Sequence, residues 1–155
     1  MIHPTAIISK EVKLGSNVKI GPYVYIDGNV SIGDNTEISA SSSITGNTSI
    51  GKNNRIFSFC SIGSIPQDLK FSGEDSFVKI GDSNTFREFC TINSGTEGGG
   101  YNTIIGNKSL FMTAVHIAHD CIVGNKVIMA NQATLGGHVI VEDNAVIGGL
   151  SAIHQ

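Results

Sequence analysis

The chain has little positive charge. Only 10 of its 155 residues are Lys or Arg, against 13 Asp and Glu, and the net charge is −3. Proteins that bind a nucleic acid backbone need clustered cationic side chains. We therefore expect no nucleic acid partner.

Long apolar runs are also missing. No segment approaches the roughly 20 consecutive apolar residues that a membrane-spanning helix needs. The N-terminal sequence, MIHPTAIISKEV, lacks the cationic start and apolar stretch of a secretory signal. We expect no membrane insertion and a cytoplasmic location.

Cysteine is scarce as well. The three cysteines, Cys60, Cys90 and Cys121, cannot all pair within the chain, and they are too far apart in sequence for a thiolate metal site. This pattern is typical of free thiols in a reducing compartment.

The abundant feature is a six-residue repeat. An aliphatic residue recurs every six positions from Ile8 to Ile62 without a miss, and an apolar residue continues the period at Ile80 and from Ile105 to Ile153. Two positions before most of them lies a small or β-branched residue, and all three cysteines occupy this position. Residues two apart on an extended segment point to the same side. The hexads therefore predict short strands with two inward side chains each, which buries the cysteines.

Turn-forming residues separate the hexads. Glycine often follows the apolar residue directly, and asparagine lies three positions after it at Asn17, Asn29, Asn35, Asn47, Asn53 and Asn144. Both residue types tolerate a left-handed backbone. No helical spacing of three and four residues is present. We predict an all-β fold over residues 1–155, a parallel β-helix in which three hexads make one triangular coil.

Two segments interrupt the repeat, at residues 64–77 (SIPQDLKFSGEDSF) and 94–102 (SGTEGGGYN). We predict that both are loops extruded from the solenoid, where functional residues tend to lie. Lys70 in the first loop, taken alone, fits an ordinary solvated side chain. The run Gly98–Gly100 lacks the Lys-Ser/Thr end and the following helix of a phosphate-binding loop, so we reject that interpretation.

Four of the five histidines are expected to lie on one edge of the solenoid. Ile117, Leu135 and Ile153 are three hexads apart and therefore stack, and the histidines lie beside them in sequence. One surface histidine is unremarkable, whereas four in three successive coils indicate a functional site. These residues are His116, His119, His138 and His154.

His119 is followed directly by Asp120. A carboxylate can orient an imidazole and support it as a general base. Neighbours on a strand point to opposite faces, so a bond between these two side chains requires the bend of a coil corner. One coil later, Gly136-Gly137 offers a backbone amide suited to an oxyanion hole, although both glycines could serve the corner alone.

Four segments together carry a family resemblance. They are IGSIPQDLKFSGE, TINSGTEGGGYNTIIG, HIAHDCIVGN and GGLSAIHQ. With them the whole chain resembles the bacterial acyl-ACP:UDP-N-acetylglucosamine O-acyltransferases of lipid A biosynthesis. The resemblance implies a left-handed β-helix and a homotrimer with active sites between subunits. It implies transfer of an (R)-3-hydroxyacyl group from acyl carrier protein to the sugar 3-hydroxyl.

The resemblance also assigns roles to residues of this chain. It implies that His119 is the general base, that Asp120 supports it, and that the Gly137 amide stabilises the oxyanion. It implies neither metal nor cofactor, because the phosphopantetheine arm of acyl carrier protein brings the thioester. The implied substrate-binding residues are Gln67, Asp68, Lys70, His116, His138, His154 and Gln155, with Gln67 the weaker candidate.

The sequence ends at Gln155, in the middle of a coil. The resembling family continues with further coils and a helical C-terminal domain. We therefore expect residues 1–155 to be a β-helix domain that is incomplete at its C-terminus and lacks the helical domain.

Three other interpretations remain open. The N-acyltransferase that acts later in the same pathway shares the solenoid chemistry, but it carries a domain ahead of its hexads, whereas the repeat here starts near Ile8. A zinc hydrase of the same fold uses three histidines from two subunits to activate water. The third is a non-catalytic scaffold, for which His119→Ala would change neither activity nor ligand binding.

Overall fold

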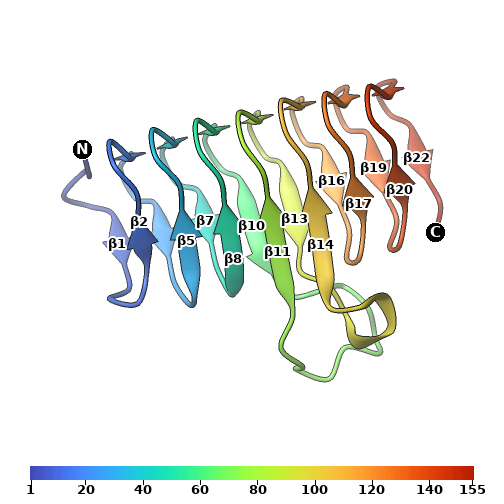
Figure 1. The fold of residues 1–155 in the computed structure, drawn as a ribbon, viewed down its shortest axis with the longest axis horizontal. Helices are drawn as coiled ribbons and strands as arrows, with labels where there is room; N and C mark the ends of the chain where they lie inside the picture. The colour runs from blue at the N-terminus through green and yellow to red at the C-terminus, as the bar shows by residue number, and fades with distance from the viewer.

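The computed structural model describes all residues, 1–155, and consists of short parallel strands in three sheets. Consecutive strands enter different sheets, and each strand pairs with the strand three places later in the chain, as β1 does with β4 (Figure 1). The first sheet holds β1 (Ile7–Ile8), β4 (Tyr25–Ile26), β7 (Ser43–Ile44), β10 (Ser61–Ser64), β13 (Thr91–Asn93), β16 (His116–Ile117), β19 (Thr134–Leu135) and β22 (Ala152–Ile153).

The other two sheets are built in the same way from seven strands each. The second holds β2 (Lys13–Leu14), β5 (Val30–Ile32), β8 (Asn47–Ile50), β11 (Phe77–Ile80), β14 (Asn102–Ile105), β17 (Ile122–Val123) and β20 (Ile140–Val141). The third holds β3 (Lys19–Ile20), β6 (Glu37–Ile38), β9 (Arg55–Ile56), β12 (Thr85–Phe86), β15 (Leu110–Phe111), β18 (Ile128–Met129) and β21 (Val146–Ile147).

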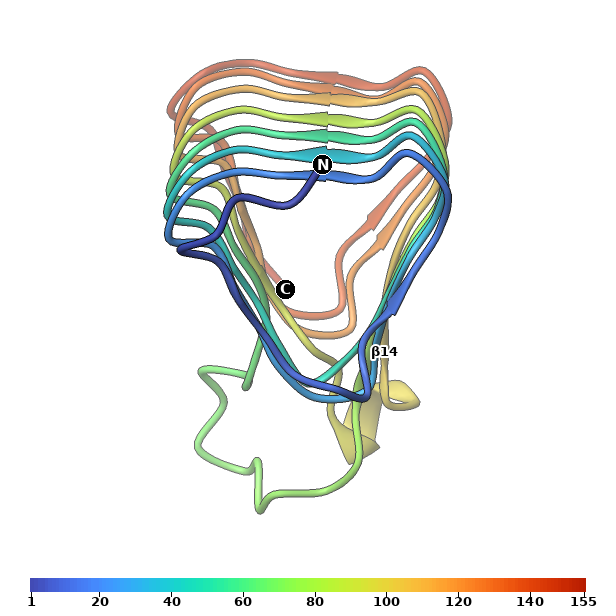
Figure 2. The ribbon, with the colours of Figure 1, turned by 90° about the vertical axis from the view of Figure 1, so that its left-hand side faces the viewer.

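The three sheets form the sides of a triangular prism. Figure 2 looks along the prism from its N-terminal end, and the chain turns counterclockwise as it recedes from the viewer. The coil is therefore left-handed. The fold class expected from the hexads and the family resemblance, a left-handed parallel β-helix, is confirmed.

The register follows the hexads. Ile8 pairs with Ile26 and Ile26 with Ile44, so equivalent apolar residues of successive coils lie above one another. They form one continuous core along the prism axis. The β-branched residues that dominate it suit an extended, laterally paired backbone. Inside this core, Phe86 and Phe111 stack with their ring centroids 4.8 Å apart.

The three cysteines are buried, as predicted, with Cys60, Cys90 and Cys121 exposed by no more than 2%. All three thiols are free. Burial raises the pKa of Cys121 to about 11. A thiol held in its protonated form is a weak nucleophile, so Cys121 serves the fold as a small apolar side chain.

A column of polar residues occupies inward positions that the repeat predicts, two residues before the apolar one, but its hydrogen bonds were not predicted. Thr36, Asn54, Asn84 and Ser109 are almost fully buried on successive coils. The Asn54 side-chain oxygen accepts a hydrogen bond from the Asn84 N–H at 2.9 Å, and the Asn84 oxygen accepts one from the Ser109 N–H at 2.9 Å. These bonds satisfy polar atoms that would be costly to bury unpaired.

The corners use the left-handed backbone region, only partly through asparagine. Asn17, Asn35, Asn53 and Asn144 have positive φ as predicted, but Asn29 and Asn47 do not. Bulky residues such as Phe59, with φ 64°, adopt the same conformation at equivalent corners. A left-handed residue costs roughly 1–2 kcal/mol. The Phe59 N–H donates to the carbonyl of Ala40 one coil earlier, which offsets this cost.

Both predicted loops leave the prism at one corner, where the chain passes from the first sheet to the second (Figure 2). The first loop joins β10 to β11, and the second joins β13 to β14 and contains a short 3-10 turn, η1 (Glu97–Gly99). We call this edge the loop corner. No helix in the chain has the length and apolar character needed to cross a membrane. The termini lie at opposite ends of the prism (Figure 1).

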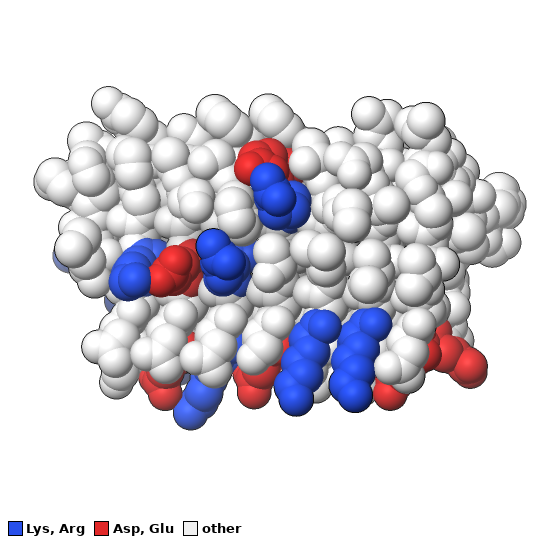
Figure 3. Space-filling model, turned by 90° about the horizontal axis from the view of Figure 1, so that it is seen from above, with Lys and Arg blue, Asp and Glu red and all other residues white.

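Charged side chains of both signs are interspersed on the third sheet (Figure 3). Lys19, Glu37 and Arg55 occupy paired positions on adjacent strands, so positive and negative charges alternate along that row. Lys19 forms an ion pair with Glu37 at 2.5 Å. Positive and negative side chains therefore alternate on this face, and it forms no uniformly cationic surface.

Candidate active site

The loop corner brings residues from successive coils together. His119 and Asp120 lie between β16 and β17, and Gly137 and His138 lie between β19 and β20. Asp120 has φ 60°, which is the bend that a bond between the side chains of two neighbouring residues requires. The His119 Nδ1 and the Asp120 Oδ2 are 2.7 Å apart. The hydrogen bond considered from the sequence is therefore present.

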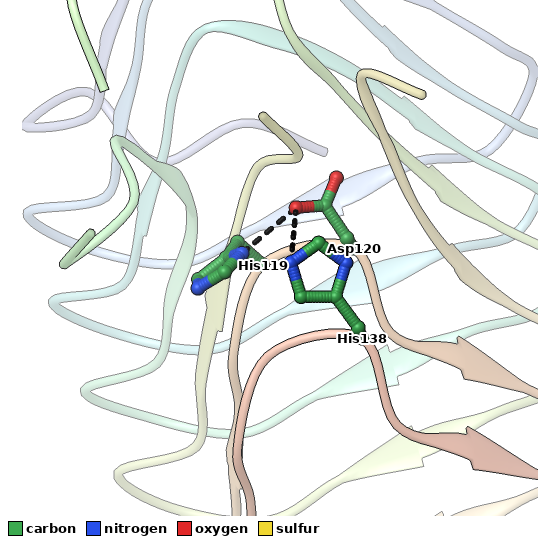
Figure 4. Close-up of side chains that lie close together, drawn as sticks. All are labelled: His119, Asp120 and His138. Carbon is green, nitrogen blue, oxygen red and sulfur yellow. Dashed lines mark hydrogen bonds and ion pairs between the residues drawn. The ribbon is translucent and has the colours of Figure 1, made fainter. Parts of the chain in front are cut away.

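Asp120 is the buried centre of the cluster, since its side chain is 0% exposed. Its Oδ2 also lies 3.8 Å from the Nε2 of His138. The rings of His119 and His138 meet edge to face, with centroids 5.1 Å apart. Figure 4 shows the carboxylate between the two imidazoles. Because a hydrogen bond to a carboxylate places the proton on Nδ1 of His119, the Nε2 atom is left as the acceptor.

An open pocket of about 850 Å³ lies in front of His119. The first loop forms its opposite wall, and the Asp68 Oδ2 is 4.0 Å from the His119 Nε2. The lining residues foreseen from the sequence are Gln67, Asp68, Lys70, His119, His138 and Gln155. The pocket therefore joins the two parts of the sequence that carried the motifs, the first loop and the histidine segments.

Two of the four histidines do not line this pocket. His116 lies on β16, where its Nδ1 is 2.7 Å from the hydroxyl of Thr91. Burial lowers the pKa of His116, and the nearby His119 adds to this effect. His154 is exposed beyond β22, and its Nδ1 is 3.1 Å from the carbonyl oxygen of Gln155. His116 and His154 therefore lie outside the pocket that this chain forms around His119 and His138.

Gly137 packs directly against the His119 ring. A Cβ atom built on Gly137 would lie 2.5 Å from the His119 Nε2, so any side chain here would displace the imidazole. The Gly137 N–H donates to no group in the chain. A buried amide without a partner is suited to an anion that forms beside the imidazole.

The second loop contributes residues that the sequence did not identify. Thr96, Glu97 and Gly98 line the pocket, together with Glu74 from the first loop. The Glu97 N–H donates to the Glu74 Oε1 at 3.2 Å, which joins the two loops. Their only sequence signal was their place in an interruption of the repeat.

His119, Asp120 and His138 place three potential metal ligands within 4.8 Å of one another. The Asp120 Oδ2, however, already accepts hydrogen bonds from His119 at 2.7 Å and from the Thr96 hydroxyl at 2.5 Å. A cation at this oxygen would have to displace both donors. The hydrogen bonds of Asp120 therefore compete with metal binding at this oxygen.

Comparisons with known proteins agree with this architecture. Residues 11–46 match the family described as bacterial transferase hexapeptide (six repeats). The acyl-[acyl-carrier-protein]--UDP-N-acetylglucosamine O-acyltransferase of Aliarcobacter butzleri is 56% identical over 99% of this chain and 59% of its own length. The chain thus spans about three fifths of that relative.

Two solved structures have the same fold and are similar in sequence. UDP-N-acetylglucosamine O-acyltransferase (LpxA) from Moraxella catarrhalis RH4 is 45% identical, with a TM-score of 0.98, over 99% of this chain and 60% of the other. LpxA from Bacteroides fragilis 9343 is 41% identical, with a TM-score of 0.78, over 99% of this chain and 68% of the other. The repeat, the loop corner and these similarities together show that the chain belongs to the UDP-N-acetylglucosamine O-acyltransferase family.

Proposed function

We propose that the loop corner is the catalytic site of an acyltransferase. The enzyme transfers an (R)-3-hydroxyacyl group from acyl carrier protein to the 3-hydroxyl of UDP-N-acetylglucosamine, the first step of lipid A biosynthesis, in the cytoplasm. Family membership supports the reaction class. The observation that carries the assignment to this corner is His119, hydrogen-bonded to Asp120 through Nδ1 and lining the pocket.

The proposed reaction begins with general-base catalysis. His119 Nε2 takes the proton of the sugar 3-hydroxyl as its oxygen attacks the thioester carbonyl carbon. The carbonyl electron pair moves to the oxygen, and the unpaired Gly137 N–H donates to the resulting oxyanion. Asp120 stabilises the imidazolium that forms beside it.

Collapse of the tetrahedral intermediate breaks the carbon–sulfur bond. The phosphopantetheine thiolate leaves and receives the proton from His119, which restores the neutral imidazole. The products are an ester on the sugar and a free thiol on the carrier. The reaction uses no metal or prosthetic group of the enzyme. His138, Asp68, Lys70 and Gln155 line the pocket and bind the substrates in this proposal, with Gln67 the weaker candidate.

Acyl transfer by the full-length protein tests this function. We expect an ester product with UDP-N-acetylglucosamine, none with its 3-deoxy analogue, and none with the acylated glucosamine used by the N-acyltransferase of the pathway. A chelator should leave the rate unchanged. Stoichiometric zinc, together with loss of activity on chelation, would instead support the metal hydrase suggested by the ligand cluster.

We also propose that the protein acts as a homotrimer with sites between subunits. The pocket is open and is walled within one chain by the two loops and the histidine segments, which leaves a side for a neighbouring subunit. Sedimentation of the full-length protein should give three times the mass of one chain. A monomer with full activity would contradict a site shared between subunits.

A further inference from the structure

The carboxylate of Asp120 depends on one residue for two of its hydrogen bonds. The Thr96 N–H donates to Oδ1 at 2.7 Å, and the Thr96 hydroxyl donates to Oδ2 at 2.5 Å. The remaining close donor is His119 Nδ1 at 2.7 Å. A fully buried carboxylate needs such donors, because its charge would otherwise be unsatisfied. Thr96 is therefore the main support of Asp120.

The position of Thr96 shows that its hydroxyl is committed to this contact. Thr96 precedes the turn η1, where a threonine hydroxyl ordinarily caps the backbone N–H groups of its own turn. Here the hydroxyl makes no such capping bond. It points instead to Asp120, which lies 24 residues further along the chain. The turn itself is held by the Thr96 carbonyl, which accepts from the N–H of Gly99 and of Tyr101.

The second loop also fixes Asp120 by close contact. A Cβ atom built on Gly99 would lie 2.0 Å from the Asp120 Cγ, so the backbone of the turn lies directly against the carboxylate. Thr96 itself is only 5% exposed, which keeps water from competing for the carboxylate. The carboxylate is held by hydrogen bonds from Thr96 and by packing against Gly99.

We propose that Thr96 is a positioning residue that determines which ring nitrogen of His119 carries the proton. By donating to both carboxylate oxygens, it fixes the plane of Asp120 so that Oδ2 faces His119 Nδ1. This orientation holds the imidazole proton on Nδ1 and leaves Nε2 free to accept a proton in the pocket. The inference rests on the proposed function, since it assigns Thr96 to the same general base.

The Thr96→Val substitution removes the hydroxyl but keeps the shape and the backbone N–H. For the full-length protein we expect kcat for acyl transfer to fall about 10-fold or more, with KM within about 2-fold. Thr96→Ser, which keeps the hydroxyl, should retain most of the activity. The ¹⁵N spectrum of the His119 imidazole should show a smaller share of the Nδ1-protonated tautomer in Thr96→Val than in the wild-type protein.

Thr103→Val is the matched control. The Thr103 hydroxyl accepts from the Asp120 N–H at 2.8 Å, so its loss disturbs the same corner without touching the carboxylate. An equal fall in kcat for Thr103→Val, or an unchanged tautomer ratio in Thr96→Val, would overturn the proposal. If the wild-type protein transferred no acyl group, the proposed function would fail, and the tautomer comparison would still decide the role of Thr96.

Discussion

Replacing His119 by alanine is expected to lower kcat for acyl transfer by about 10²- to 10⁴-fold, the usual contribution of a general base. The substitution removes the acceptor for the sugar hydroxyl proton and leaves the buried Asp120 carboxylate with hydrogen bonds from Thr96 alone. Single-turnover measurement with saturating substrates would isolate the chemical step from product release. The comparison should use the full-length protein.

His3→Ala is a suitable control for this experiment. His3 is exposed at the N-terminal end of the prism, and its Nδ1 contacts only Thr5. Its loss should leave kcat unchanged. A His119→Ala protein that kept wild-type kcat would remove His119 from the proton transfer and with it the role assigned to the loop corner.

Replacing Phe86 by alanine is expected to destabilise the fold by about 3–5 kcal/mol. Phe86 and Phe111 are fully buried and stacked on adjacent coils, with their ring planes 10° apart. The alanine would leave a cavity in the middle of the prism, where the neighbouring coils cannot close around it. Urea unfolding followed by circular dichroism would measure the change.

A second phenylalanine pair supplies the control for Phe86→Ala. Phe59 and Phe89 also stack, with centroids 5.2 Å apart, but on the outer surface, where Phe89 is 55% exposed. Phe89→Ala should lower the stability of the fold by no more than about 1 kcal/mol, because folding removes little of the Phe89 side chain from water. Similar losses for both variants would contradict the assignment of the stability to the interior stack.

The regular part of the fold was predictable because one rule governs it. An apolar residue at every sixth position, such as Ile26 or Ile44, must face inward in each strand, and the pairing of equivalent positions follows. Asn54 and Asn84 break the apolar rule at inward positions. Their burial depends on hydrogen bonds to the next coil, which no local pattern in the sequence reveals.

The site was predictable only in part, for a similar reason. That His119 and His138 lie at one edge of successive coils follows from counting hexads, and the structure places their ring centroids 5.1 Å apart. Thr96 and Gly99 lie in a loop outside the repeat, so counting hexads does not locate them. Gly99 belongs to a glycine run whose interpretation as a phosphate loop we rejected, and its actual contact is with Asp120.

The loop corner draws its residues from consecutive coils, and each coil touches only its neighbours, which makes the site sensitive to coil number. A whole coil added before β10 would lengthen the prism and leave the pocket intact. The same coil added between β17 and β19 would move Gly137 away from the His119 ring by about 4.8 Å, one strand spacing. From β10 to β22 the number of coils is therefore fixed by the site. Before β10, coils can be added without changing the site.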